Sequence, residues 1–500
     1  MTDDTGKVYL VGAGPGDPGL LTLRGKELLE RARVVVYDSL VNDALLRHAP
    51  GAETIDVGKR PGKQPLTQDD INRVLIDQAR EGGCIVRLKG GDPFIFGRGG
   101  EEASALVAAG IAFEIVPGVT AGVGAAAYAG IPLTQRGLTG HVTFVTGHAN
   151  ADFSALPKDG TLVIYMGVDA LAANLDALID AGHKRETPAA AIEWGTLPRQ
   201  HTVTATLGKL AAHCDKSELH APAVIVVGQV VTLRETLAWF EDRPLFGKRV
   251  VVTRTRRRAA ELVRLLRDQG ADVFEFPTVE IEASANLDPL GDLSRFDWIV
   301  LTSVNGVDTL FDRLSNEGQD ARALHGTKLC AISAKTAEAL NARSINVDAV
   351  PDQYESDVVV QHLEHVAGSL EGHAILMPRA DIGRSTLPDA LRSAGATVEE
   401  LQAYRTVVPA STEALLKALG KFDPHYVTFG SAVSARNFHE ILGSERTDAL
   451  AKTARFAAIG PIAADAASDC GMSAAVVPEI HTVNELVETL VRFDSEIGSA

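Results

Sequence analysis

Residues 87–102 read RLKGGDPFIFGRGGEE, an apolar strand pattern followed by a dense run of glycines. Gly90 and Gly91 come directly after the strand and allow the backbone to approach a ligand closely. Asp92 can accept hydrogen bonds from an amine or a hydroxyl, and the apolar run FIF supplies walls for a flat ring. A tight glycine-rich turn leading into a helix is the alternative. The composition favours a ligand-binding loop.

Short apolar runs alternate with amphipathic helical stretches on both sides of this loop, which indicates α/β units with largely parallel sheets. Two sets of five strands are expected, with the change between them at Pro117-Gly118. The strands are expected near KVYLVGAG, RVVVYDSL, TIDVG, CIVRLKGG and FEIVPG, and then near HVTFVTGH, TLVIYMG, AAAIEWG, HTVTATL and AVIVVGQVV.

A boundary is expected near residues 241–247, where a helix LRETLAWFEDR is stopped by Pro244 and a new strand, VVVTR, begins. We therefore expect one domain over residues 1–243, with lobes of about 1–117 and 118–243. A second domain is expected over residues 244–500.

The second domain contains an internal repeat. Arg254 and Arg379 are separated by the same number of residues as Gly270 and Gly395. The first arginine and glycine occupy the same places in one strand–helix–strand pattern as the second arginine and glycine do in the next. A duplicated α/β unit predicts two similar lobes, and a cleft between lobes is a common place for a small-molecule site.

Composition excludes several classes of function. The net charge of −17 and the aromatic content of 5% argue against binding nucleic acid or an anionic membrane. The four cysteines form no CxxC pair, and His141 and His148 are expected on opposite faces of one strand, so no metal site is expected. With no signal peptide pattern and no run of ~20 apolar residues, we expect a cytoplasmic protein.

The segment VGAGPGDPGLLTLRG resembles a dinucleotide fingerprint only in part. Gly12 and Gly14 fit the first two glycines, but Asp17 stands where the third should be. A Walker A loop is also absent from the sequence. NAD and nucleoside triphosphates are therefore not expected.

The first half resembles the tetrapyrrole methyltransferase family, and most closely its uroporphyrinogen-III C-methyltransferases. The motifs that carry the resemblance occur in order over residues 6–235: VGAGPGDPGLLTL, VVYDSLV, GKR, RLKGGDPFIFGRGGEE, VPGVTAG, AYAGIPLT, VTGH, YMG, EWGT and PAVIVVG. The resemblance implies two α/β lobes, S-adenosylmethionine bound in the cleft between them with S-adenosylhomocysteine as product, and a homodimer formed through this half.

The resemblance also implies site residues. The cofactor site would include Pro15, Gly90, Gly91, Asp92, Ile95, Thr120, Ala121, Met166, Gly195 and Ala223. Asp38 and Lys59 are implied as acid/base residues. The alternatives are a helix N-cap for Asp38, an exposed loop position for Lys59 and a core position for Met166.

A substrate with eight carboxylates would need cations, and the first half offers a pool of them. Arg98 and Arg136 are the substrate contacts that we expect, and the remaining members of the pool are Lys59, Arg60, Lys63, Arg87 and Lys89.

Residues 246–492 resemble uroporphyrinogen-III synthase through VVTRTRRRAAELVRLLRDQGA, DWIVLTSVNGV, ILMPRADIGRSTLPDALRSAGATV, AYRTV and the AAIGP segment. The resemblance implies two flavodoxin-like α/β lobes and no cofactor. The first lobe would combine residues 246–280 with 408–500, and the second would span 281–407.

In this family a tyrosine is proposed to assist loss of the substrate hydroxyl, and Tyr404 matches it; an ordinary strand aromatic is the alternative. Other residues at strand ends could hold carboxylates, although turn and cap positions are equally open to the hydroxyl residues among them. These residues are Thr302, Ser303, Asn305 and Ser431, together with Arg254 and Arg379.

The sequence thus predicts a bifunctional enzyme acting on tetrapyrroles. It would cyclise hydroxymethylbilane to uroporphyrinogen III and methylate that product twice to precorrin-2, on the way to sirohaem or cobalamin. Two alternatives remain: a methyltransferase for another acceptor, and a second half that is a degenerate ligand-sensing module.

Overall fold

The computed structural model describes residues 6–58, 66–148, 152–284, 292–380, 386–407, 409 and 412–498. The chain divides into two compact units. The first unit comprises residues 1–250, 262–273 and 487–500, and the second comprises residues 251–261 and 274–486. Across both units, the strands of the described residues form four five-stranded sheets.

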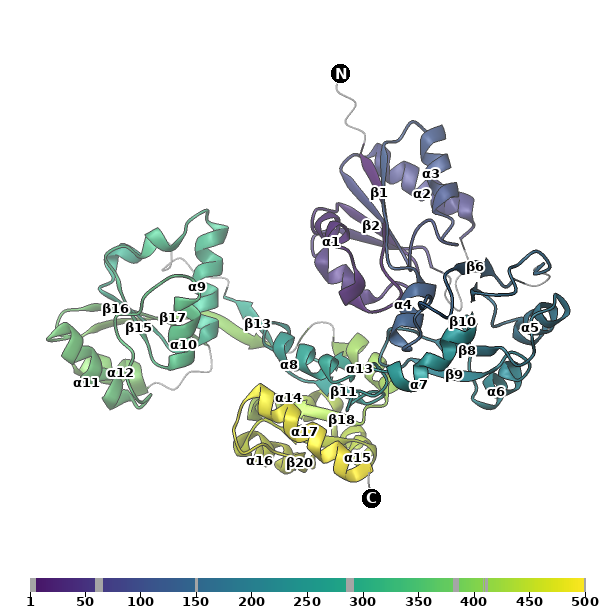
Figure 1. Ribbon diagram of the computed structural model, residues 1–500. Helices are drawn as coiled ribbons and strands as arrows, with labels where there is room; N and C mark the ends of the chain where they lie inside the picture. Colours follow the sequence, from purple (N-terminus) through teal and green to yellow (C-terminus); the bar gives the residue numbers. More distant parts are fainter. Residues whose placement is uncertain are drawn as a thin grey trace. The chain divides into compact units, whose positions relative to one another are not determined.

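The first sheet has the strand order β3-β2-β4-β1-β5, and every neighbouring pair is parallel. Its strands are β1 (Lys7–Gly12), β2 (Val34–Tyr37), β3 (Glu53–Asp56), β4 (Cys84–Lys89) and β5 (Phe113–Val116). Figure 1 shows α1 (Leu23–Glu30) on one face and α2 (Gln68–Arg80) with α3 (Gly99–Ala108) on the other. Each face has its own buried apolar cluster, so the strands are apolar on both sides.

The second sheet has the order β6-β7-β10-β8-β9. Its strands are β6 (Val142–Thr146), β7 (Thr161–Tyr165), β8 (Pro188–Glu193), β9 (His201–Thr206) and β10 (Ala223–Val227). Helix α4 (Ala121–Tyr128) packs on one face, and α5 (Leu171–Asp180) with α6 (Leu210–Lys216) packs on the other.

The expectation of largely parallel sheets is wrong for this second sheet. Only β6 and β7 pair in parallel, whereas β10 runs antiparallel to both β7 and β8, and β8 runs antiparallel to β9. Residues 194–200 between β8 and β9 are too few for a crossover helix, and a short connection forces antiparallel pairing.

The expected helix over LRETLAWFEDR is also wrong. A 3-10 helix over Gln229–Leu233 leads into α7 (Arg234–Leu237), which ends after one turn. Beyond it the Trp239 indole N–H donates to the carbonyl of Ala127 (3.0 Å), and Phe240 is buried. Tertiary packing of these aromatic side chains outweighs the local helix propensity.

The repeat in the sequence corresponds to a repeat in topology. The third sheet runs β12-β11-β18-β19-β20, and the fourth contains β17-β16-β14-β15 with β13 added beside β17. The strands of the third are β11 (Arg249–Val252), β12 (Asp272–Glu275), β18 (Tyr426–Phe429), β19 (Arg455–Ala458) and β20 (Ala474–Val476). Those of the fourth are β13 (Glu280–Ala283), β14 (Trp298–Leu301), β15 (Lys328–Ala331), β16 (Ala374–Ala380) and β17 (Thr397–Val407).

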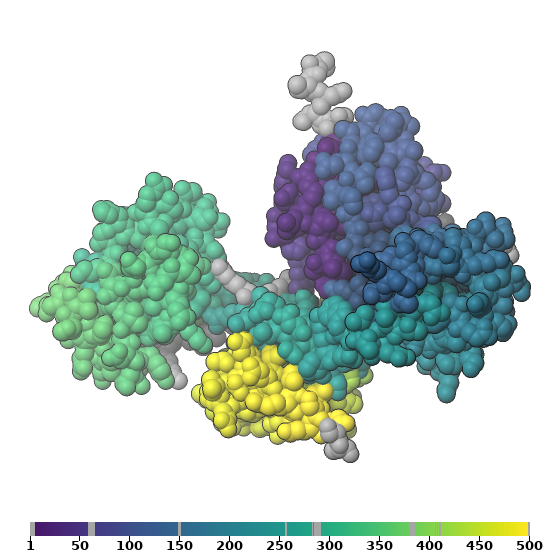
Figure 2. Space-filling view, in the orientation of Figure 1, coloured from purple at the N-terminus to yellow at the C-terminus, as the bar shows by residue number. Residues whose placement is uncertain are grey.

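Gly270 and Gly395 show why the repeat retained glycine. Both lie between a helix and the following strand, with φ of +93° and +90°, a conformation that other residues rarely adopt. The helices of this half are α8 (Arg256–Asp268), α9 (Val304–Asn316), α10 (Ala334–Asn341), α11 (Ser356–Ala367), α12 (Thr386–Ser393), α13 (Thr412–Phe422), α14 (Ala432–Leu442), α15 (Ser444–Thr453), α16 (Pro461–Asp469) and α17 (Val483–Gly498). Residues 292–380 and 386–407 enclose two apolar cores and form the green body in Figure 2.

Candidate functional site

A cavity of about 240 Å³ lies in the first unit, with walls from both of its sheets. We call it the enclosed cavity because it is less open to solvent than the hollow next to it that is described below. The first sheet contributes the loops after β1 and β4, and the second contributes residues in or just after β7, β8 and β10. All ten residues predicted for the cofactor line this cavity: Pro15, Gly90, Gly91, Asp92, Ile95, Thr120, Ala121, Met166, Gly195 and Ala223.

The two glycine-containing loops that line the cavity, after β1 and after β4, are joined by backbone hydrogen bonds. The Gly91 N–H donates to the carbonyl of Gly14 (2.8 Å), and the Gly14 N–H donates to that of Gly91 (3.2 Å). The Asp92 carboxylate accepts from the N–H groups of Phe94 (2.7 Å) and Gly118 (3.0 Å). Asp92 therefore braces the loop, and each of its oxygens keeps a lone pair for a ligand.

Tyr165 is a cavity residue that sequence reasoning missed. Its phenol oxygen lies 2.9 Å from the Thr120 hydroxyl and accepts from the Gly122 N–H at 2.9 Å. A methyl group at Gly122 would collide with this phenol, so glycine is needed for α4 to approach β7. Burial raises the pKa of Tyr165. The sequence could have indicated Tyr165 as a cavity residue through its position directly before Met166 in the YMG motif.

Trp194 and Leu197 also line the cavity and were not identified from the sequence, whereas Phe96 belongs to the FIF run that was expected to supply apolar walls. Phe96 and Trp194 adopt positive φ (+52° and +46°), as does the predicted Met166 (+52°), and Leu197 completes the wall. Strained backbone of this kind persists only where surrounding structure enforces it, and it concentrates at ligand sites.

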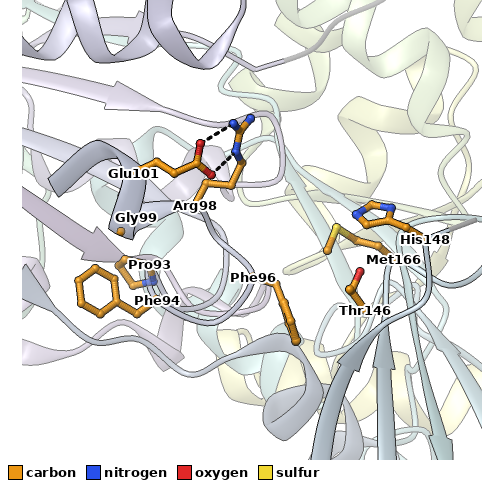
Figure 3. Close-up of a pocket in the computed structure, with 10 residues that line it drawn as sticks. Pro93, Phe94, Phe96, Arg98, Gly99, Glu101, Thr146, His148 and Met166 are labelled. Atoms are coloured by element: carbon orange, nitrogen blue, oxygen red, sulfur yellow. Dashed lines mark hydrogen bonds and ion pairs between the residues drawn. The ribbon is translucent and has the colours of Figure 1, made fainter. Parts of the chain in front are cut away.

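A more open hollow of about 560 Å³ adjoins the cavity, because Phe96 and Met166 line both. Figure 3 shows Arg98 on one side of it, paired with Glu101 (Nη2 to Oε2, 2.7 Å), and Thr146, His148 and Met166 on the other. Arg136 lies exposed in a turn and lines neither space, so the structure does not bring it together with Arg98.

Asp38 follows β2 directly, and its Oδ1 accepts from the Arg87 guanidinium (Nη2, 2.5 Å). The alternative of a helix N-cap is wrong for Asp38, since the next helical turn is capped by Asn42. Leu40, two residues on, lines the enclosed cavity, although Asp38 itself does not. Lys59 lies outside the described residues, as do Arg60 and Lys63.

Arg87 and Lys89 are wrong as members of a substrate-binding pool. Their side chains are 2% and 4% exposed, and both reach Glu102 Oε1, from Arg87 Nε at 3.1 Å and from Lys89 Nζ at 2.9 Å. Burial, together with the nearby charge of Arg87, lowers the pKa of Lys89. Alternation along β4 points both cations to the side covered by α3, which carries Glu102.

In the second half, Tyr404 and Ser303 form a pair. Tyr404 on β17 is buried, and its phenol oxygen lies 2.9 Å from the Ser303 hydroxyl. Ser303 is also the N-cap of α9, accepting from Gly306 N–H, and Ser431 caps α14 through Ser434 N–H. The cap interpretation is thus correct for both serines. Thr302 and Asn305 flank Ser303, the latter in the first turn of α9.

The two repeat-related arginines differ in their partners. Arg379 Nη1 donates to Glu400 at 2.8 Å. Arg254 is half-buried and has no hydrogen-bond or ion-pair partner among the described residues, although Glu275 stands where the repeat places Glu400. Burial and the charge of Arg258 lower the pKa of Arg254. A side chain at Gly430 would collide with its guanidinium.

Two negative findings concern the described part of the chain. It contains no cluster of three His, Cys, Asp or Glu side chains that could hold a metal ion. None of its helices is both long and apolar enough to cross a membrane.

Comparison with known proteins adds the following. Residues 7–211 match the model of the tetrapyrrole (corrin/porphyrin) methylases, and residues 260–488 match that of uroporphyrinogen-III synthase HemD. A porphyrin biosynthesis protein HemD of Ruminiclostridium josui is 36% identical over 99% of this chain and 98% of its own length. A uroporphyrinogen-III C-methyltransferase of Synechocystis is 51% identical, covering 47% of this chain and 94% of its own. The solved uroporphyrin-III C-methyl transferase of Thermus thermophilus complexed with S-adenyl homocysteine is 41% identical, with a TM-score of 0.40, over 46% of this chain and all of that one.

Proposed function

The chain belongs to the tetrapyrrole methylases in its first half and to the uroporphyrinogen-III synthases in its second, and we propose that it makes uroporphyrinogen III and methylates it. It is a bifunctional enzyme of tetrapyrrole biosynthesis. The second half closes hydroxymethylbilane to uroporphyrinogen III. The first half transfers two methyl groups from S-adenosylmethionine, which gives precorrin-2.

The enclosed cavity fits S-adenosylmethionine by its chemistry. Gly90 and Gly91 leave backbone exposed to a ligand, because a side chain at Gly90 would meet only Leu40. Asp92 and Thr120 offer oxygens, and Ile95 belongs to an apolar wall of the kind that holds a purine ring. When bound, this molecule supplies an electrophilic sulfonium methyl group, so the protein's main contribution is orientation.

The observation that carries the methyltransferase proposal is the shared wall of the two spaces. Phe96 and Met166 line both the enclosed cavity and the open hollow, so a donor in the first would face an acceptor in the second. Arg98 offers its cation to a carboxylate of the acceptor, and its pairing with Glu101 fixes the guanidinium. Arg136 would meet an acceptor only at the periphery.

Methylation of a pyrrole-ring carbon is followed by loss of a proton. We assign the acceptance of this proton to the carboxylate of Asp38, with Lys59 as a second acid/base residue.

In the synthase half, Tyr404 would protonate the departing hydroxyl of hydroxymethylbilane, and the Ser303 hydroxyl would hold the phenol in place. Carboxylates of the substrate would be bound by hydroxyl, amide and guanidinium groups at strand ends, which are those of Thr302, Ser303, Asn305, Ser431 and Arg254. This half would need no cofactor.

We propose that the boundary between the methyltransferase and the synthase lies between residues 243 and 244. The protein would be a cytoplasmic homodimer formed through the methyltransferase half. Within the synthase, residues 246–280 and 408–500 form one lobe and residues 281–407 the other.

The two activities can be tested separately on the full chain. With uroporphyrinogen III and S-adenosylmethionine, we expect two molecules of S-adenosylhomocysteine per tetrapyrrole, and release of none contradicts the methyltransferase assignment. With hydroxymethylbilane alone, we expect the type III isomer. Formation of only the type I isomer contradicts the synthase assignment and favours a ligand-sensing second half.

A further inference from the structure

A buried ionic cluster surrounds the end of β4, the strand that leads directly into Gly90 and Gly91 of the enclosed cavity. It consists of Arg87, Lys89 and Glu102, which are at most 4% exposed, and of Asp38, whose carboxylate is 30% exposed. Two cations therefore face two carboxylates. Buried ion pairs often add little net stability relative to apolar side chains, so their presence calls for a further reason.

The guanidinium of Arg87 is held from several sides. Its Nε donates to Glu102 Oε1 (3.1 Å), and its Nη1 lies near the carbonyls of Leu88 (3.3 Å) and Val36 (3.4 Å). Its Nη2 donates to Asp38 Oδ1 (2.5 Å). The planar fork of arginine makes this arrangement rigid, and only Arg87 binds the Asp38 side chain among the described residues.

We propose that Arg87, fixed by Glu102, is a positioning residue for methyl transfer: it binds Asp38 Oδ1 and thereby presents Oδ2 as the acceptor of the substrate proton. The inference rests on the proposed methyltransferase function. Methylation leaves a cationic ring whose methylated carbon carries no hydrogen; one proton then passes from the adjacent bridging methylene to Oδ2, the C–H electron pair forms a double bond to the ring and neutralises it, and Arg87 keeps its own protons. Lys89 balances the charge of Glu102, which leaves Arg87 free to stabilise Asp38.

A purely structural ion pair would predict a loss of stability without a specific loss of turnover. Arg33 offers a matched control in the same lobe, immediately before β2, whereas Asp38 immediately follows that strand. Its guanidinium is similarly engaged, with Nε to the carbonyl of Gly82 (2.8 Å) and Nη2 to that of Gln78 (2.7 Å).

The experiment compares R87Q, R87K, D38N, the double variants D38N/R87Q and D38N/R87K, and R33Q in the full chain. Release of S-adenosylhomocysteine gives kcat and both KM values, calorimetry gives the affinity for S-adenosylhomocysteine, and thermal unfolding gives Tm. Because general acid–base catalysis contributes about 10²–10⁴-fold, we expect D38N to lower kcat by about 10²-fold or more. We expect R87Q to lower kcat at least about tenfold with KM for S-adenosylmethionine unchanged, and R87K to recover part of that loss.

The decisive comparison is the double variant. If Arg87 acts through Asp38, D38N/R87Q turns over no more slowly than D38N alone, and R33Q lowers only Tm. If the fold losses in kcat of D38N and R87Q multiply in the double variant, the proposal is overturned. A normal kcat in R87Q overturns it as well. If R87Q does not fold, R87K and D38N/R87K give the same comparison. An inactive wild-type chain that still makes the type III isomer would instead contradict the methyltransferase function itself, and the inference with it.

Discussion

The hydroxyl oxygen of Ser303 and the phenol oxygen of Tyr404 lie 2.9 Å apart in the second half of the chain. Ser303 also accepts the Gly306 N–H at 3.1 Å, so a single side chain caps α9 and contacts the tyrosine. The start of the helix thus fixes the position of the phenol, because displacing Ser303 would leave an N–H group of the first turn unsatisfied.

Tyr404→Phe removes the only group in this pair that we expect to protonate the leaving hydroxyl. We expect the rate of type III formation to fall about tenfold or more, with a loss of about 1 kcal/mol in stability from one hydrogen bond. The measurement is the ratio of type III to type I isomer over time. Tyr354→Phe is the matched control, since that phenol is 75% exposed in the same half. Equal rates in the two variants would exclude the role of Tyr404.

Arg254 and Arg379 should respond differently to substitution by glutamine, although the repeat relates them. Arg254 has no hydrogen-bond or ion-pair partner among the residues that the structure describes, so R254Q is expected to raise KM for hydroxymethylbilane about tenfold, the equivalent of one charge-assisted hydrogen bond. R379Q leaves Glu400 paired with Arg392 and is expected to affect mainly stability. Gly430→Ala, which would displace the Arg254 guanidinium, should reproduce the R254Q result. An unchanged KM in both R254Q and G430A contradicts this assignment.

Asp92→Ala should weaken binding of S-adenosylhomocysteine. The substitution removes the two carboxylate oxygens that accept from the N–H groups of Phe94 and Gly118 and so brace the glycine loop. Each of these hydrogen bonds is made to a charged group and is worth about 1.5–3 kcal/mol. We expect calorimetry to show at least a tenfold rise in Kd. Asp152→Ala is the control, because Asp152 accepts an N–H two residues on (Ser154, 2.9 Å) and lines neither space. The same loss of affinity in both variants would show a general effect on folding.

Tyr128 should contribute to alkaline unfolding. Burial, reinforced by its hydrogen bond to Asp17 (2.7 Å), raises the pKa of Tyr128 well above the value near 10 of an unfolded tyrosine. The unfolded chain therefore loses this proton first as the pH rises past 10, and the stabilisation, complete below pH 10, declines above it. One proton corresponds to at most about 1.4 kcal/mol per pH unit. Urea unfolding between pH 9.5 and 11.5 should show a shallower decline for Tyr128→Phe; equal slopes would contradict this.

The sequence predicted the strands that carry the site because their apolar runs and glycine punctuation are local signals. The ten residues inferred by resemblance for the cofactor all line one cavity, since motifs at strand ends meet at the same edge of a sheet. Tyr165 and Trp194 were missed because their contribution depends on the approach of the two sheets. The sequence indicated Asp38 as a site residue but not its pairing with Arg87. In the sequence Arg87 looks like an ordinary cation, and only the fold shows that α3 places Glu102 beside it.

The incorrect expectations have tertiary causes. The helix expected over LRETLAWFEDR ends early because Trp239 and Phe240 pack against the preceding lobe. The antiparallel pairing in the second sheet follows from a short connection, which the alternation of apolar runs does not reveal.

The central claim is that one chain both makes and methylates uroporphyrinogen III. The most direct measurement supplies the purified full chain with hydroxymethylbilane and S-adenosylmethionine under anaerobic conditions and analyses the tetrapyrrole formed. We predict a dimethylated product of the type III series, with two molecules of S-adenosylhomocysteine released for each. Unmethylated type I uroporphyrinogen as the only product would contradict the account.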